Sequence, residues 1–305
     1  MRVIKPVQIT EDLLISSSVA EPSGSDPAAW SNSVSYVVDD FVYVAATHRV
    51  YKCIANNTGT DPVVNSALPT PTAWTDYGPT NRWAMFDQEV NTQSTGDSPL
   101  SVVLQPGIVN AIALLELVGT QAVVTMRDEL GGAVVYTRTA VLERSSVLDW
   151  SAYFFEPFQQ LASLVLTDLP SYLNGAIYVD ITGTGAPKCG ALIVGRVYSL
   201  GGTEHGVQAG IRDYSRKEVD ETTGVTSLQL GKFSKRMQAR MCLESNAVNG
   251  VQSLLTSLRA TPCVWIGDDS GAYDALVVFG FYRDFRLDVA YPTLTYCSLD
   301  IEGML

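Results

Sequence analysis

The sequence contains little charge, only two histidines and no long apolar run. Charged residues make up 17% of the 305 residues, and the histidines are His48 and His205. A Ser–His–Asp or Cys–His site must use one of them. His48 lies in a segment too small to hold a cleft and His205 in a glycine-rich turn, so neither predicts such a site. No run approaches the roughly 20 apolar residues that cross a bilayer, so membrane insertion is not expected.

Basic residues are also scarce, since 20 Lys and Arg stand against 32 Asp and Glu and give a net charge of −12. Duplex DNA and anionic lipid attract positively charged proteins, so neither is expected as a specific partner. The first twenty residues carry charges and no continuous apolar segment, which is not typical of a secretory signal. The five scattered cysteines are expected to be buried free thiols of a protein made in a reducing cytosol.

No motif of the sequence predicts an enzyme. It lacks a Gly-x-Ser-x-Gly elbow, a phosphate-binding loop and the His/Cys spacing of a metal site. Three acidic groups could in principle supply the two carboxylates of a glycosidase, namely Asp39-Asp40, Asp268-Asp269 and Glu218/Asp220/Glu221. Neighbours on a strand point to opposite faces, so solvated turns explain these acids better. We expect no catalysis, no metal and no cofactor.

The sequence does contain many strand-length segments rich in β-branched residues and separated by Gly, Pro, Asn or Asp. They cover 100–104, 109–118, 122–126, 133–139, 161–166 and 176–181. This pattern predicts a mainly β protein and, at this spacing, a β-sandwich or jelly roll. Gly131-Gly132 is expected to form a hairpin turn, because glycine adopts positive φ without steric cost.

The segment after Cys189 predicts a second β unit with one helix. A strand at 191–200 precedes a long hairpin with arms at 207–218 and 225–243, joined by polar residues. The helix is expected to begin with Ser245 or Asn246 as N-cap and to end before Pro262. Its apolar stripe consists of Val248, Val251, Leu254, Leu255 and Leu258. Strands at 262–266, 275–289 and 293–301 follow.

Residues 28–80 are dense in aromatic and poor in aliphatic side chains. The aromatic positions that stand out are Trp30, Tyr36, Tyr43, Tyr51 and Trp74. Their spacing resembles the small chitin-binding type of carbohydrate-binding module (families 5 and 12). That resemblance implies that the rings stack on sugar, whose C–H faces pack on flat π surfaces. The alternative is that these rings form the core of the module or anchor a protein interface.

The order of strand, long hairpin, helix, hairpin and final strand in 189–305 resembles the tail-tube fold of phage tail tube, distal tail and baseplate proteins. In that family the long hairpin extends sheets between neighbouring subunits of a ring. The opening Asn81-Arg82-Trp83-Ala84-Met85-Phe86-Asp87 is similar to those of siphophage tail-associated proteins. Together these resemblances imply a siphophage distal-tail or baseplate protein. It would be made in the host cytoplasm and located in the virion, among copies of itself and neighbouring tube, hub or fibre proteins, with host-surface glycan as a candidate ligand.

Seven basic residues lie on the arms of the long hairpin: Arg212, Arg216, Lys217, Lys232, Lys235, Arg236 and Arg240. They could form a solvated face, or line a lumen that DNA crosses. We favour subunit contacts, because a self-assembling protein of net charge −12 benefits from complementary patches.

The sequence therefore predicts four parts. They are an N-terminal arm and linker (1–27), a small carbohydrate-binding-module-like domain (28–80), a jelly-roll-like β-sandwich (81–188) and a tail-tube-like β-sandwich with one helix (189–305). A structural tail-tip role is the leading hypothesis. A free carbohydrate-binding or adhesin protein is the alternative, and a glycan-degrading enzyme would need a pair of carboxylates in a cleft.

Overall fold

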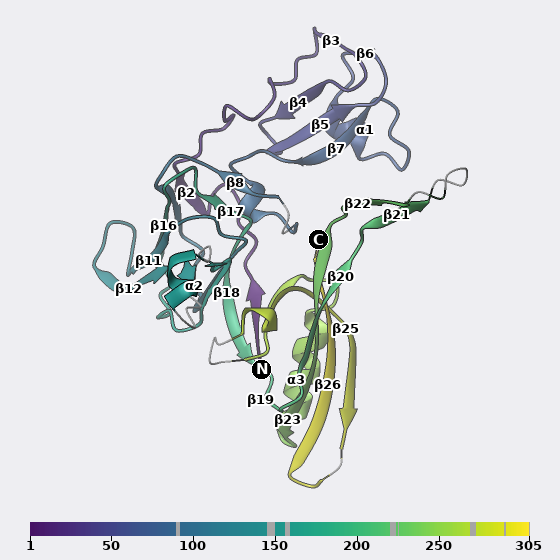
Figure 1. The fold of residues 1–305 in the computed structure, drawn as a ribbon. Coiled ribbons are helices and arrows are strands. Elements are labelled where there is room, and N and C mark those ends of the chain that lie inside the picture. Colours follow the sequence, from purple (N-terminus) through teal and green to yellow (C-terminus); the bar gives the residue numbers. More distant parts are fainter. Residues whose placement is uncertain are drawn as a thin grey trace.

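The computed structural model describes residues 1–89, 92–144, 150–155, 159–219, 224, 226–268, 273–289 and 291–304. The protein is mainly β, as the sequence predicts, and Figure 1 shows its strands in three regions. A small module lies at one end, a sandwich in the middle and a helix-covered sheet at the other end. No helix within the described ranges has the length and apolarity to cross a bilayer.

One large antiparallel sheet of ten strands runs through the body of the molecule. Its order is β15 (Ser163–Leu166), β10 (Ala111–Leu115), β18 (Ala191–Ser199), β1 (Arg2–Pro6), β24 (Cys263–Ile266), β25 (Val277–Asp288), β26 (Leu294–Gly303), β23 (Phe233–Glu244) and β19 (Gly202–Thr203), with β20 (Gln208–Asp213) also paired to β23. The sheet joins strands from the expected middle and C-terminal parts.

Strand β1 lies inside this sheet and is not the arm expected for the N-terminus. It pairs with β18 along one edge and with β24 along the other. Val3 and Ile4 are both fully buried, and each belongs to a different hydrophobic cluster. Because both edges and both faces of β1 are satisfied, the interpretation of residues 1–27 as arm and linker is wrong for this segment.

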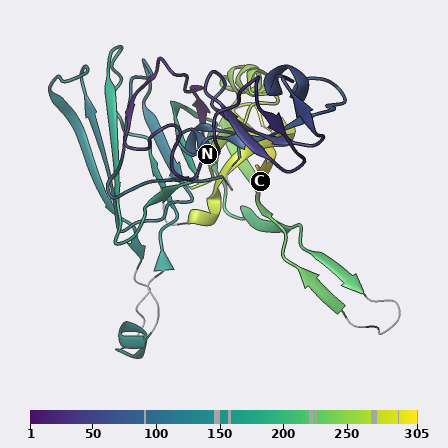
Figure 2. The same ribbon diagram turned by 90° about the horizontal axis from the view of Figure 1, so that it is seen from above.

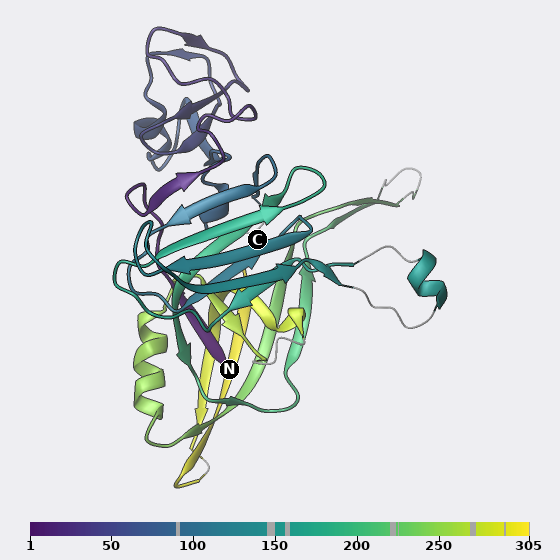
Figure 3. The same ribbon diagram turned by 90° about the vertical axis from the view of Figure 1, so that its left-hand side faces the viewer.

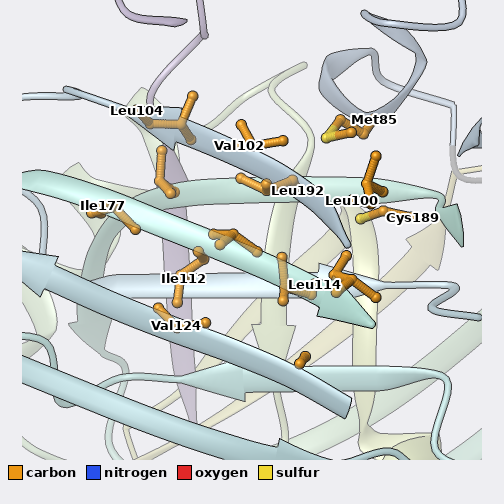
Figure 4. Close-up of a cluster of buried hydrophobic side chains, with 14 of the residues drawn as sticks. Met85, Leu100, Val102, Leu104, Ile112, Leu114, Val124, Ile177, Cys189 and Leu192 are labelled. Carbon is orange, nitrogen blue, oxygen red and sulfur yellow. The ribbon is translucent and has the colours of Figure 1, made fainter. Parts of the chain in front are cut away.

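A five-stranded sheet covers part of the large one and completes a β-sandwich. Its order is β12 (Val134–Val141), β11 (Gln121–Arg127), β16 (Ala176–Thr182), β9 (Leu100–Leu104) and β2 (Leu14–Ser17). Side chains from both sheets, such as Leu100, Ile177, Ile112 and Leu192, fill the space between them (Figure 4). Since β18 supplies Leu192 to this core, the boundary expected between 188 and 189 runs through the sandwich.

Two short β pairs and two turns complete the sandwich region. β8 (Ser94–Thr95) pairs with β17 (Lys188–Cys189), and β13 (Glu143–Arg144) pairs with β14 (Gln159–Gln160). The hairpin between β11 and β12 contains Gly131 at φ +76°, which confirms the predicted turn. The 3₁₀ turns η1 (Ala84–Phe86) and η2 (Asp274–Leu276) precede β8 and β25.

Helix α3 (Val248–Ser257) covers one face of the C-terminal part of the large sheet. Its Val251 and Leu255 are buried in a cluster with Met237, Met241 and Leu299 of the strands. The predicted helix and apolar stripe are therefore present, but the predicted caps are wrong. Ala247 is the N-cap residue without a side-chain hydrogen bond.

The small module has its own core and a sheet of β4 (Phe41–Val44), β5 (Arg49–Cys53) and β7 (Trp74–Pro79). β3 (Ser35–Tyr36) pairs with β6 (Asn57–Thr58), and the short helix α1 (Pro62–Ser66) follows. The Asp61 side chain caps α1 by accepting hydrogen bonds from the N–H groups of Val63 and Val64.

Two segments project from the body, as Figures 2 and 3 show. One carries α2 (Trp150–Phe155) beyond the β13–β14 pair. The other is the predicted long hairpin, in which β20 and β23 continue into β21 (Arg216–Val219) and β22 (Thr226–Gln229). We call its described residues beyond the sheet, which are 214–219, 224 and 226–230, the hairpin arm.

Candidate functional site

The hairpin arm is a two-stranded ribbon whose two faces differ in chemistry. Residues directly opposite each other in an antiparallel pair share a face. Lys217 pairs with Leu228, and Val219 with Thr226. One face, called the apolar face below, therefore carries Leu228 and Val219 beside Lys217 and Thr226. The other face is polar, because Arg216 pairs with Gln229 and Glu218 with Ser227.

The apolar face of the arm is open to solvent. Leu228 is 78% exposed, and Leu230, directly after β22, is 97% exposed. An isolated two-stranded ribbon is only marginally stable in water, and exposed apolar side chains favour contact with another surface. The arm is therefore a candidate interaction surface.

The base of the arm has a fixed geometry. Tyr214 N–H donates to the Lys232 carbonyl at 3.0 Å, and Gly231 N–H donates to the Ser215 hydroxyl at 3.0 Å. Any Cβ at Gly231 would overlap the Tyr214 carbonyl oxygen, so glycine is required by the close approach of the two strands. The Ser215 hydroxyl and N–H hydrogen bonds lower the pKa of Asp213. These contacts fix the direction in which the arm leaves the sheet.

The seven basic residues expected at subunit contacts do not form one patch. Arg212 Nη1 lies 3.0 Å from Glu302, Arg240 Nε lies 3.5 Å from Glu204, and Lys232 Nζ lies 3.7 Å from Glu89. These three cations therefore have acidic partners within the chain. Lys235 is half-buried and Arg236 is exposed.

Arg216 and Lys217 remain as exposed cations on the arm. Both belong to β21, and both are exposed. Among the residues that the structure describes, no carboxylate is placed against either of them. Lys217, which shares a face with Leu228, is the member of the predicted set that best fits an intermolecular contact, whereas Arg216 lies on the polar face.

The face of the large sheet opposite α3 is polar. In its register Arg236 lies opposite Glu302, Gln238 opposite Asp300, and Arg286 opposite Ser298. Both signs occur across β25, β26 and β23, with Asp284 opposite Asp300 and with Arg286 and Arg240 on either side of Ser298, so neither sign dominates. Such a surface is suited to contact with water.

The aromatic residues singled out in the module are mainly its core. Tyr36, Tyr43, Tyr51 and Trp74 are buried, and Trp30 is half-buried against the same cluster. Trp74 is 0% exposed, meets Tyr36 edge-on at 5.1 Å, and donates from Nε1 to the Thr60 carbonyl at 3.0 Å. A buried ring cannot offer its face to sugar. The expected sugar platform is therefore wrong for the four buried rings, and the core alternative describes them.

Two other aromatic residues of the module are exposed together. Phe41 and Tyr77 lie 4.9 Å apart in an edge-on pair, and Lys52 Nζ lies 5.8 Å from the Phe41 ring centre. Lys52 also contacts Asp39 at 2.7 Å. Strand alternation places Phe41 on the face opposite the buried Val42, so the sequence contained a signal for it. Tyr77 is the extra residue of β7 at a register shift against β5, which the sequence pattern does not reveal.

A cleft of about 880 Å³ lies between the small module and the body. Its apolar lining includes Val7 and Ile9 before β2, Phe86 of η1, Ile193 of β18 and Phe279 of β25. Its acidic lining residues are Glu11, Asp87 and Glu89, accompanied by His48 and Arg49. His48 thus borders a cleft that the module alone was too small to provide.

One wall of this cleft is fixed by the carboxylate of Glu21, whose side chain is 9% exposed. It accepts hydrogen bonds from the Thr80 hydroxyl at 2.7 Å and from Trp83 Nε1 at 3.0 Å. Its other contact is His48 Nδ1 at 3.0 Å, and the His48 ring stacks on Trp83 with centres 4.4 Å apart. These contacts join the module to the body.

Asp87 is a half-buried carboxyl of the same cleft. Burial raises its pKa to about 6, against the hydrogen bonds that it accepts from the Thr92 hydroxyl and the Glu89 N–H. Perturbed carboxyls in clefts are often functional, but a single one does not make a catalytic pair.

The acidic groups considered for glycoside cleavage do not meet at one site within the described residues. Asp220, Glu221 and Asp269 lie outside those residues, as does most of the polar connection expected between the hairpin arms. No cluster of three or more metal-ligating side chains occurs in the described ranges. All five cysteines are free, and burial raises the pKa of Cys189 and Cys263 to about 12.

The projecting segment that carries α2 also has exposed aromatic residues. Trp150 is 80% exposed, and its ring stacks with that of Phe154, with centres 6.4 Å apart.

A scan against protein-family models found no match, and a search of curated proteins found none. Functional inference therefore depends on the surfaces themselves.

Proposed function

We propose that this chain is a structural component of a bacteriophage tail tip or baseplate, similar to distal tail proteins, and that it assembles with copies of itself into a ring. The observation that carries the proposal is the hairpin arm, with Leu228 and Leu230 exposed on a ribbon only two strands wide. Such an arm is stabilised when a neighbouring chain covers its apolar face.

The proposed ring is based on the asymmetry of this contact. An arm that docks on a different surface of the next copy makes a head-to-tail interface, and such interfaces close into rings when the rotation between copies allows it. The polar face of the large sheet fits a surface that stays wet inside or outside the ring. Neighbouring tube, hub or fibre proteins are the proposed partners, and the proposed role needs no catalysis and no cofactor.

A second candidate role is contact with host-surface glycan, which the exposed pair of Phe41 and Tyr77 favours. Ring faces pack on the C–H faces of sugars, and the nearby Lys52 and Asp39 provide polar groups. This role is compatible with a tail tip, where the module would point outward. A free adhesin would bind glycan in the same way but would remain monomeric.

The proposal is tested by mass photometry and negative-stain microscopy of the purified protein over a range of concentrations. Immunogold labelling of phage particles that carry the gene tests the location. We expect closed rings with peripheral modules, and labelling at the tail tip. Monomers at every concentration together with unlabelled particles would overturn the proposal.

A further inference from the structure

The cleft between module and body has the chemistry of a receptor for an amphipathic segment. Its lining is apolar at Ile9, Ile193 and Phe279, and acidic side chains lie at Glu11 and Glu89. Glu11 and Glu89 are 83% and 57% exposed at their side chains, so both are accessible to an incoming cation. A volume of about 880 Å³ is at the upper end of the range for pockets that enclose a drug-sized ligand.

The hairpin arm has the complementary chemistry on one face. Leu228 and Val219 supply apolar area, and Lys217 lies directly opposite Leu228 on the same face. This face of the arm therefore presents one cation beside Leu228, Val219 and Thr226. The cleft presents three carboxyls, accompanied by His48 and Arg49, beside an apolar floor. Complementary charges of this kind fix register and suppress wrong partners.

The arm does not reach the cleft of its own chain. Figures 2 and 3 show β21 and β22 extending away from the small module. Beside the base of the arm, Lys232 in the connection to β23 contacts Glu89 of the cleft at 3.7 Å. An arm that enters this cleft would therefore belong to another molecule.

We propose that the cleft receives the β21–β22 arm of a second copy of this chain, with Leu228 against the apolar floor and Lys217 at the acidic rim. This inference rests on the proposed ring and names its two contact surfaces. It also gives the small module a structural role, because Ala46, Thr47 and His48 form part of the receiving surface. The Glu21 contacts to Thr80, Trp83 and His48 then set the width of the cleft.

Charge exchange in the full-length chain tests this contact. Lys217→Glu on the arm, or Glu11→Lys with Glu89→Lys in the cleft, is expected to raise the concentration needed for rings about tenfold or more. Combining both sets restores opposite charges and is expected to recover most of the assembly. Arg216→Glu is the matched control, since Arg216 lies on the polar face of the same strand and should leave assembly unchanged.

A photocrosslink identifies the surfaces without changing a charge. Benzoylphenylalanine in place of Leu228 should crosslink to cleft residues of another copy, as mass spectrometry of isotopically mixed rings would reveal. These residues are 6–11, 46–49, 79, 83, 86–89, 192–193, 261–262 and 279. Crosslinks to other regions, or rings unaffected by both charge sets, would overturn the docking site but leave the ring proposal intact. A wild-type protein that forms no rings and labels no particles would overturn both.

Discussion

Lys217 and Leu228 lie directly opposite each other on the hairpin arm, with their side chains on the same face. A lysine beside an exposed leucine combines a charge that selects a partner with apolar area that stabilises the contact. On the reverse face, Arg216 and Gln229 are polar throughout. The arm therefore has one face suited to burial and one suited to solvent.

The first prediction concerns the apolar face of the arm. Leu228→Ser combined with Leu230→Ser should abolish rings at concentrations where the wild type assembles, because the exposed apolar area is lost. The free energy of unfolding should change by no more than about 0.5 kcal/mol, since neither side chain packs in the body. Leu173 is also an exposed leucine, at 70%, and lies outside the arm. Leu173→Ser is therefore the matched control and should leave assembly intact. Rings in the double variant would contradict a role for this face.

The second prediction separates the two groups of aromatic residues in the module. Trp74→Ala removes a fully buried ring and should destabilise the module by about 3–5 kcal/mol, observed as loss of its resonances or as rapid proteolysis of residues 28–80. Tyr51→Phe removes only a hydroxyl that lies 3.1 Å from Thr47 and should leave the module folded. A folded Trp74→Ala module would contradict the assignment of this ring to the core.

The third prediction concerns glycan contact. Tyr77→Ala should weaken retention on insoluble chitin or host cell-wall polysaccharide about tenfold, because loss of an aromatic anchor costs more than 1 kcal/mol. The fold should be unchanged, since Tyr77 is 67% exposed. Tyr273→Ala, at another exposed tyrosine outside the module, is the control. Equal retention of both variants would exclude the Phe41–Tyr77 pair as the contact.

The fourth prediction concerns the junction at Glu21. Glu21→Gln replaces one acceptor oxygen by an NH₂ group that cannot accept from Thr80, Trp83 and His48 in the same geometry. We expect the free energy that holds the module on the body to fall by about 1–3 kcal/mol. The measurement is the rate of proteolytic cleavage in the connecting segment around residue 25, which should rise. Glu11→Gln, at a side chain open to solvent, should not change the cleavage rate. Equal rates in all three proteins would show that the junction does not depend on this carboxylate.

The fifth prediction is a pH dependence at Asp87. Its pKa in the folded protein is about 6, above the ordinary value of 3.8, so the folded state holds this proton more tightly. The contribution of Asp87 to stability therefore falls as the pH rises from about 3.8 through 6. Asp87→Asn removes this cost and should raise stability at pH 7.5 by about 1 kcal/mol after allowance for solvent screening, with little gain at pH 4. The difference in unfolding free energy between these two pH values is the measurement, and an equal gain at both would contradict the burial of this carboxyl.

The sequence predicted the C-terminal elements well because their signals are local. The apolar stripe at Val251 and Leu255 specifies one helix face, and the residues beyond Pro262 form the expected strands. The long hairpin was also predicted, and β20 and β23 pair along it as expected. The N-cap was predicted wrongly. Ser245 and Asn246 were better candidates by residue type, but Ala247 is the residue that precedes the helix.

The domain boundaries could not be derived from local pattern. Whether β1 is an edge or a central strand depends on β18 and β24, which lie nearly 200 residues or more away in the sequence. The cleft depends on the same long-range arrangement, since Val7, His48, Ile193 and Phe279 come from four separate segments. Aromatic residue type was equally ambiguous, because it predicted both the buried Trp74 and an exposed platform.

The measurement that tests the central claim most directly is mass photometry of the purified wild-type chain beside the Leu228→Ser, Leu230→Ser variant. The account predicts a single higher oligomer for the wild type, seen as closed rings by microscopy, and monomers for the variant at the same concentration. The same oligomer in both proteins would show that the arm does not hold the copies together, and would contradict the account.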